Sequence, residues 1–280
     1  MRYFDTAPHY GLGLAEQRLG RALAKYPRDE VVVSTKVGRL LVPTPENAHQ
    51  LDDDGFDVPA RFRREWDFSR DGILRSLESS LDRLGMDRVD VVYLHDPDNH
   101  WDAASTTGMD ALVELREQGV IAAIGAGMNQ SAMLTEFVRR CDVDLVMLAG
   151  RYTLLDQSAA DDLLPMALAR GVDVVAAGVY NSGLLSKPVV SDDSHYEYGT
   201  APSQLLERAR AMAAICAEYD VTLPDAAVQF PLRHAAIVSA VLGPRDASQT
   251  QDGLRRATAD VPEALWTALE SAGHLRPTSS

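Results

Sequence analysis

The stretch RYFDTAPHYGLGLAEQRLG (Arg2–Gly20) begins with a short apolar strand pattern that ends at Asp5. A loop with two glycines follows and carries Tyr10, five residues beyond Asp5. The loop leads into LAEQRLGRALAKY, whose apolar spacing is typical of an amphipathic helix. A strand that leads through a short loop into a helix is one β-α unit, and Asp5 and Tyr10 stand at its junction.

The same unit recurs along the chain. The apolar runs are rich in Val and Ile and nearly unbroken, which favours parallel strands buried on both faces. Helical patterns alternate with them, so we predict a parallel sheet with right-handed crossovers. The runs are Arg2–Asp5, Glu30–Lys36, Arg88–His95, Val120–Gly127, Val143–Gly150, Val172–Tyr180 and Ala236–Gly243.

Seven predicted strands in a chain of this length favour a (β/α)8 TIM barrel over an open doubly wound sheet. A full barrel has one more strand, and the chain begins on a strand without a preceding helix. We therefore predict one α/β barrel domain over residues 1–280 that lacks its first strand-helix unit. Two barrel strands would then have unpaired edges, and we expect poor solubility or weak activity of the chain as given.

Composition excludes some classes of function. The 27 basic and 41 acidic residues give a net charge of −14, which argues against a nucleic-acid partner. Cys141 and Cys216 are interpreted as buried small hydrophobic residues, with no metal site. No run is long enough for a membrane span and no signal pattern is present, so we expect a cytoplasmic protein, monomeric or a small homo-oligomer, with a small-molecule substrate.

Polar residues stand at the ends of successive predicted strands. Asp5, Lys36 and His95 each end a run, and Tyr10 follows the first. A tyrosine hydroxyl can act as general acid or base if a cation lowers its pKa, and Lys36 could be that cation. Asp5 could orient Lys36, and His95 could orient a substrate oxygen. Each of these residues alone is better interpreted as a turn residue or a solvent-exposed residue. Their occurrence at successive strand ends favours a catalytic site.

These residues lie in motifs that resemble the aldo/keto reductase family. FDTAPHYGLGLAEQRLG resembles its first signature, STKVGR resembles the strand with its catalytic lysine, and SLESSLDRLGMDRVDVVYLHDPD resembles its central signature. The resemblance extends from Arg2 to about Leu269 and implies a catalytic tetrad of Asp5, Tyr10, Lys36 and His95. In that family Tyr10 would donate the proton in carbonyl reduction and accept it in alcohol oxidation.

The resemblance also implies an NAD or NADP cofactor. A Rossmann fingerprint is absent, because Glu16 stands where GLGLAE would need its third glycine. The family pattern instead assigns the cofactor to Asn129 in GAGMNQ, to Val179 or Tyr180 in GVYNSGLL, and to Gly243, Pro244, Arg245 and Gln249 in the loop after the last strand. A glutamine usual in the family is missing near Ala149, and the single arginine Arg245 favours NAD or use of both dinucleotides.

The motifs APHYG, LHDPD and NSGLL resemble the branch of D-threo-aldose 1-dehydrogenases (L-fucose or galactose dehydrogenases) and pyridoxal 4-dehydrogenases. These enzymes oxidise a cyclic hemiacetal to a lactone. Polar groups from His95 to Trp101 and the long irregular loop Gly38–Asp67 would suit a polyol at the mouth of the site. The alternatives are an NADPH-dependent aldehyde or ketone reductase of broad specificity, a non-catalytic dinucleotide-binding module, and an inactive fragment.

Overall fold

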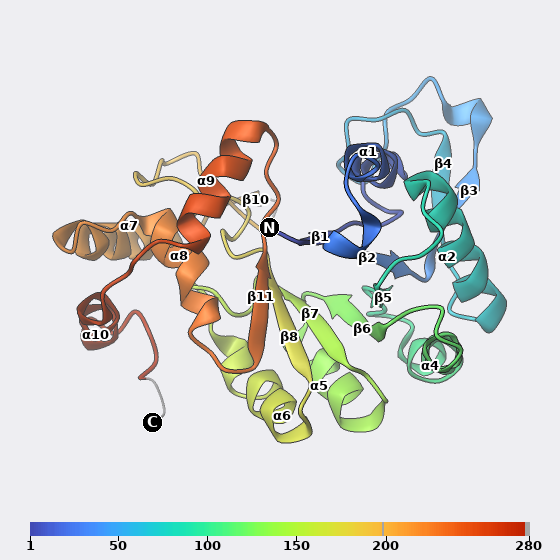
Figure 1. Ribbon diagram of the computed structural model, residues 1–280. Helices are drawn as coiled ribbons and strands as arrows, with labels where there is room; N and C mark the ends of the chain where they lie inside the picture. Colours follow the sequence, from blue (N-terminus) through green and yellow to red (C-terminus); the bar gives the residue numbers. More distant parts are fainter. Residues whose placement is uncertain (198, 278–280) are drawn as a thin grey trace. The chain divides into compact units, whose positions relative to one another are not determined.

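The computed structural model describes residues 1–197 and 199–277 (Figure 1). The chain forms two compact units. Unit 1 consists of Met1–Met128 and Glu136–Met147, and unit 2 consists of Asn129–Thr135 and the chain from Leu148 onward. Helix α5 (Ser131–Arg140) and strand β7 (Leu145–Ala149) contribute residues to both units, so each unit is described by itself.

Unit 1 is built on a parallel sheet in the order β1-β2-β5-β6, which continues into the first residues of β7. Helices α2 and α4 pack beside these strands, and α1 packs against α2 (Figure 1). The strands of this sheet are β1 (Tyr3–Asp5), β2 (Val32–Val37), β5 (Val91–His95) and β6 (Ala123–Met128). The helices are α1 (Leu14–Leu23), α2 (Arg70–Leu84), α3 (Trp101–Ala103) and α4 (Met109–Glu117), with short helical turns η1 (Arg28–Glu30), η2 (Pro45–Asn47) and η3 (Ala104–Gly108).

The sequence explains why these strands lie at the centre. All five residues of β5 are buried, as are the last five of β2. Burial on both faces suits the apolar residues of these strands, and the polar side chains of Ser34, Lys36 and His95 are buried with them. The parallel register pairs Asp5 with Ser34 and Lys36 with Tyr93. The carboxyl ends of β1, β2 and β5 therefore lie at one edge of the sheet.

Helix α2 has the ends that its sequence predicts. The Ser69 hydroxyl caps the first turn by accepting a hydrogen bond from the Gly72 amide at 3.1 Å. Gly85 ends the helix with a φ of 63°, a left-handed conformation that glycine adopts without strain. Helix α1 approaches α2 closely at Gly20, where an added Cβ would lie 1.9 Å from the Leu84 carbonyl oxygen.

The loop between β2 and α2 is more ordered than the sequence suggests. Instead of an irregular insertion, residues 39–66 form an antiparallel hairpin of β3 (Arg39–Pro43) and β4 (Phe62–Trp66). Its register pairs Arg39 with Trp66 and Leu41 with Arg64. After Arg39, β3 is apolar, whereas β4 has three charged residues in a row. Neither strand shows the alternation of apolar and polar residues typical of a hairpin, so the pairing was not visible in the sequence.

Unit 2 continues the alternation of strands and helices. The end of β7 is followed by β8 and then by β11 in the sheet order. Its apolar core is formed largely by residues of α7, α8 and α10, among them Met212, Phe230 and Trp266. The elements are η4 (Ser158–Ala160), α6 (Leu163–Arg170), β8 (Asp173–Ala177), β9 (His195–Tyr196), β10 (Gly199–Thr200), α7 (Ser203–Glu218), α8 (Leu223–Leu232), β11 (Ile237–Val241), α9 (Ala247–Ala257) and α10 (Glu263–Ser271).

Every apolar run interpreted as a parallel strand contains one, so the predicted β-α alternation is confirmed. The single domain over residues 1–280 stays a prediction, and its last three residues lie outside the described part of the chain. No helix within residues 1–197 and 199–277 combines the length and the apolar character needed to cross a bilayer.

The close approach at Gly20 gives a test of the packing of α1 against α2. We expect Gly20→Ala to lower the free energy of unfolding by about 1 to 3 kcal/mol, because the new methyl group would overlap the Leu84 carbonyl. Gly243→Ala is the matched control, since an added Cβ there meets nothing within 4 Å. Chemical denaturation of both variants measures the effect, and equal stability of the two would contradict this packing.

Candidate active site

Unit 1 brings together the four residues that the sequence singled out. Asp5 is the last residue of β1, Lys36 lies in β2 and His95 is the last residue of β5. Tyr10 lies in the turn between β1 and α1, where Gly11 and Gly13 adopt positive φ angles of 59° and 86°. This turn folds the chain back over the carboxyl ends of the strands.

Lys36 and Asp5 form the central contact of the site. The Lys36 ammonium donates to Asp5 Oδ2 at 2.5 Å and to the Thr6 carbonyl at 3.1 Å. Only 2% of the Lys36 side chain and 5% of the Asp5 side chain is exposed. Burial alone would lower the pKa of Lys36, but the Asp5 carboxylate beside it raises this pKa above its ordinary value. Lys36 is therefore a fixed positive charge at neutral pH.

Tyr10 lies next to that charge. The Lys36 nitrogen is 4.8 Å from the centre of the Tyr10 ring, and the His95 ring stands edge-on to Tyr10 with 5.7 Å between centroids. Lys36 acts to lower the pKa of Tyr10, as the sequence predicts. Burial nevertheless outweighs it, and the pKa of Tyr10 is raised above its ordinary value. In this structure the Tyr10 hydroxyl therefore holds its proton.

His95 is neutral in this environment. Its side chain is 4% exposed, and burial together with the charges of Lys36 and Arg39 holds its pKa well below the ordinary value. Its Nε2 lies 3.5 Å from Asp96 Oδ2, and its buried Nδ1 has no hydrogen-bond partner within the described residues. A neutral imidazole can donate a hydrogen bond to a substrate oxygen without adding a second positive charge.

A chain of hydroxyl groups supports Asp5 on its other side. The Ser34 hydroxyl donates to Asp5 Oδ1 at 2.6 Å, and the Tyr3 hydroxyl lies 2.9 Å from Ser34 Oγ and 3.0 Å from the Tyr93 hydroxyl. Both Asp5 oxygens are thus bonded, which fixes the carboxylate. The sequence analysis did not identify these hydroxyl groups. A signal was present, because Tyr3, Ser34 and Tyr93 each stand two residues before a tetrad member on the same strand.

A second ion pair, only partly buried, lies beside His95. Arg39, the first residue of β3, donates to Asp96 Oδ2 at 2.6 Å and stacks on the Trp66 ring at 4.3 Å. Asp96 follows His95 directly and has a positive φ of 40°, which is uncommon for a residue other than glycine. Burial raises the pKa of Asp96, while Arg39 opposes this. In the sequence, Asp96 directly after His95 indicated a charged group at this place. Its partner Arg39 could not be identified, because its position depends on the hairpin.

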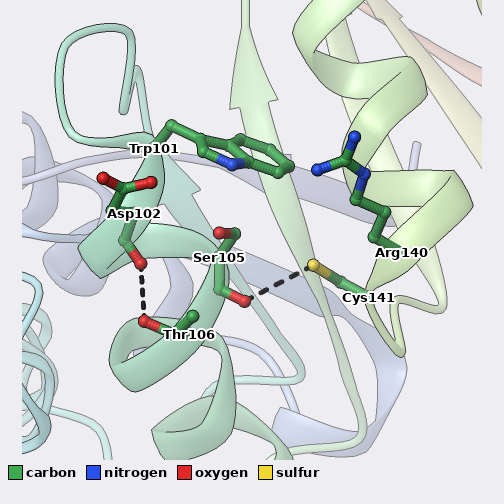
Figure 2. Close-up of a pocket in the computed structure, with 6 residues that line it drawn as sticks. All are labelled: Trp101, Asp102, Ser105, Thr106, Arg140 and Cys141. Carbon is green, nitrogen blue, oxygen red and sulfur yellow. Dashed lines mark hydrogen bonds between the residues drawn. The ribbon is translucent and has the colours of Figure 1, made fainter.

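The residues expected at the mouth of the site pack against different neighbours and do not form one group. His100 packs on Trp66 at 5.1 Å, and Trp101 packs edge-on against Phe137 at 4.9 Å. Figure 2 shows the pocket that Trp101 lines together with Asp102, Ser105, Thr106, Arg140 and Cys141. None of the tetrad residues lines this pocket, so it is distinct from the candidate active site.

In unit 2 the predicted cofactor residues after β11 gather at the start of α9. Gly243, Pro244, Arg245 and Gln249 are all exposed. Asp246 caps the helix by accepting from the Gln249 amide at 2.8 Å, and Gln249 Oε1 accepts from the Arg245 amide at 2.9 Å. A helix N-terminus with an exposed arginine and an open glycine turn fits a dinucleotide pyrophosphate. Their assignment to the cofactor stays a prediction.

The other predicted cofactor residues also lie in unit 2. Asn129 is exposed, and its carbonyl accepts from Arg151 Nε at 2.9 Å. The Tyr180 hydroxyl accepts from Arg256 of α9 at 2.9 Å, so this ring is held beside the same helix. Val179 is 1% exposed and packs in the interior. A cofactor contact from Val179 would therefore have to come from its backbone.

Comparison with known proteins identifies the family. The family model described as "Aldo/keto reductase family" matches residues 1–273. A D-threo-aldose 1-dehydrogenase from Pseudomonas sp is 49% identical to this chain, with 99% of this chain and 85% of the relative covered. A pyridoxal 4-dehydrogenase from Microbacterium luteolum is 38% identical, with 98% and 84% covered.

Solved structures agree in fold. The aldo-keto reductase AKR11C1 from Bacillus halodurans, in its holo form, is 24% identical, with 97% of this chain and 82% of that chain covered and a TM-score of 0.72. The glycerol dehydrogenase AKR11B4 from Gluconobacter oxydans is 21% identical, with 100% and 85% covered and a TM-score of 0.74. The predicted aldo/keto reductase fold is thereby confirmed. This chain belongs to the aldo/keto reductase family of NAD(P)-dependent oxidoreductases.

Proposed function

We propose that this protein oxidises the anomeric hydroxyl of an aldose, or of a similar cyclic hemiacetal, to a lactone. The observation that carries the proposal is the buried Lys36–Asp5 pair beside the Tyr10 ring, with neutral His95 edge-on to the same ring. The substrate class is supported by similarity to the D-threo-aldose 1-dehydrogenase and the pyridoxal 4-dehydrogenase.

We propose a role for each member of the tetrad that agrees with its position. The ionised Tyr10 oxygen takes the proton of the anomeric hydroxyl, and the Lys36 charge stabilises that ionised form. Asp5 holds Lys36 in place, and His95 orients the substrate oxygen through a hydrogen bond. When bound, NAD(P)+ would supply the redox chemistry, because its nicotinamide ring can accept a hydride. The anomeric C–O bond becomes a carbonyl, so atoms and charges balance.

The dinucleotide would be held by residues of unit 2. Arg245 and the start of α9 fit its phosphates, and Asn129 carries an amide suited to the nicotinamide carboxamide. With one exposed arginine at the turn, we propose that NAD is used, alone or together with NADP. We also propose a cytoplasmic location, a monomer or small homo-oligomer, and no nucleic-acid partner.

A second candidate function follows from the raised pKa of Tyr10. A hydroxyl that keeps its proton is a ready general acid, which favours reduction of an aldehyde or ketone with NADPH. The two functions share the same tetrad and differ in the substrate and in the direction of the reaction.

The substrate proposal predicts oxidation of L-fucose or D-arabinose, followed by the absorbance of the reduced dinucleotide. We expect Tyr10→Phe to lower this turnover roughly a hundredfold to ten-thousandfold, because the proton acceptor is lost. Tyr26→Phe, at a side chain 61% exposed, is the matched control and should leave the rate unchanged. Turnover limited to simple aldehydes with NADPH would favour the second candidate instead.

The Lys36–Asp5 pair predicts a strong coupling in stability. Lys36→Met should lower the free energy of unfolding by about 3 to 5 kcal/mol, because it leaves the buried Asp5 charge without its partner. The double variant Lys36→Met/Asp5→Asn should lose clearly less than the sum of the two single variants. Denaturation curves of the four proteins measure this, and additive losses would contradict a direct buried pair.

The pKa of Tyr10 predicts opposite pH dependences in the two directions. Oxidation needs the ionised Tyr10, and its pKa lies above the ordinary value, so log kcat/KM for oxidation should rise by about one per pH unit from neutral to alkaline pH. Reduction needs the protonated form and should stay flat over that range. Profiles measured in both directions test this, and an oxidation rate that is flat with pH would exclude Tyr10 as the titrating base.

A further inference from the structure

His9 lies against the tetrad but takes no part in the proton transfer proposed above. Its ring is 5.5 Å from the His95 ring and 5.9 Å from the Tyr10 ring, between centroids. Phe56 of the β3–β4 hairpin packs edge-on against the His9 ring, with 5.1 Å between the ring centroids. The side chain is 14% exposed, so it is largely enclosed by these groups.

Arg64 of strand β4 fixes which nitrogen of His9 carries the proton. Arg64 Nε donates to His9 Nδ1 at 2.6 Å, and a second guanidinium nitrogen donates to the His9 carbonyl at 3.3 Å. A guanidinium has only donors, so His9 Nδ1 must act as an acceptor. A neutral His9 then carries its proton on Nε2, and that N–H bond points away from Arg64.

The acidic residues of the hairpin hold Arg64 in this position. Asp52 accepts two hydrogen bonds from Arg64, at 2.7 and 2.9 Å, and its side chain is 2% exposed. Asp54 Oδ2 is 3.7 Å from His9 Nδ1, beyond hydrogen-bond distance, and its side chain is 54% exposed. The hydrogen-bond partner of His9 Nδ1 is therefore Arg64, at 2.6 Å, and not Asp54.

Electrostatics keep the His9 ring neutral. Burial lowers the pKa of His9 to about 4, and the charges of Arg39 and Arg64 act in the same direction against Asp54 and Asp52. At neutral pH the His9 imidazole is uncharged. Its Nε2–H is then a hydrogen-bond donor beside the rings of Tyr10 and His95. An enclosed donor at this place suits a substrate oxygen next to the reacting carbon.

We propose that His9 determines substrate specificity by donating its Nε2–H to the hydroxyl on the carbon adjacent to the anomeric carbon, and that Arg64 is the positioning residue that sets this tautomer. The substrate class in this inference rests on the proposed function. The competing interpretation is that the Arg64–His9 bond only fastens the hairpin to the turn before α1.

Kinetics with a matched pair of sugars separate these interpretations. D-arabinose and 2-deoxy-D-ribose differ only in the hydroxyl next to the anomeric carbon. We expect His9→Leu to lower kcat/KM for D-arabinose roughly tenfold to a hundredfold, and for the deoxy sugar less than about threefold. His9→Gln, which keeps a donor near the Nε2 position, should recover part of the loss.

Equal losses on the two sugars would overturn the inference while leaving the proposed function intact. If the wild-type protein oxidises no aldose, the proposed substrate class fails and the inference fails with it. The two failures are thus distinguished by wild-type turnover alone.

An NMR measurement tests the tautomer without any turnover. In long-range ¹H–¹⁵N spectra of the ¹⁵N-histidine-labelled protein, the His9 signals are those missing from His9→Gln. We expect the neutral Nε2–H form in the wild type and a mixture of both tautomers in Arg64→Met. A wild-type His9 that is charged, or protonated on Nδ1, at neutral pH would overturn the inference.

Discussion

The ion pair between Lys36 and Asp5 is the constraint on which the site depends. Two charged side chains are removed almost completely from water, which is tolerated only because they bond to each other and to further polar groups. Ser34 and the Thr6 carbonyl provide those bonds. Tyr10 therefore lies next to the positive charge of Lys36, which water cannot reach and screen. Together with burial, this fixed charge also helps to hold the pKa of His95 well below its ordinary value, so that His95 is neutral.

For the proposed reaction, this arrangement would allow one site to serve both directions. Burial raises the pKa of Tyr10 and favours the protonated acid, while Lys36 stabilises the ionised base. The balance between them decides how much base is present at a given pH. The Arg39–Asp96 pair adds a second set of charges close to His95, so the electrostatics of the site are shared between the strand ends and the β3–β4 hairpin.

Much of this structure was predictable from local sequence. The strands were visible because parallel strands buried on both faces need largely apolar runs, and α2 was delimited by Ser69 and Gly85. The tetrad could be placed together because strand ends share one edge. The partners of His9 and Arg39 could not be predicted, because they depend on the register of the hairpin, which brings residues such as Arg64 across from distant positions. The net pKa of Tyr10 was equally hidden, since it depends on burial that only the folded chain defines.

The central claim is that hydride leaves the anomeric carbon of an aldose while the tetrad removes the hydroxyl proton. The most direct test is to incubate the protein and NAD+ or NADP+ with D-arabinose that carries deuterium at the anomeric carbon, and to locate the label by mass spectrometry. The account predicts that the wild-type protein transfers the deuterium to the nicotinamide ring and that Tyr10→Phe transfers almost none. Label that stays in the sugar or is lost to water would contradict it.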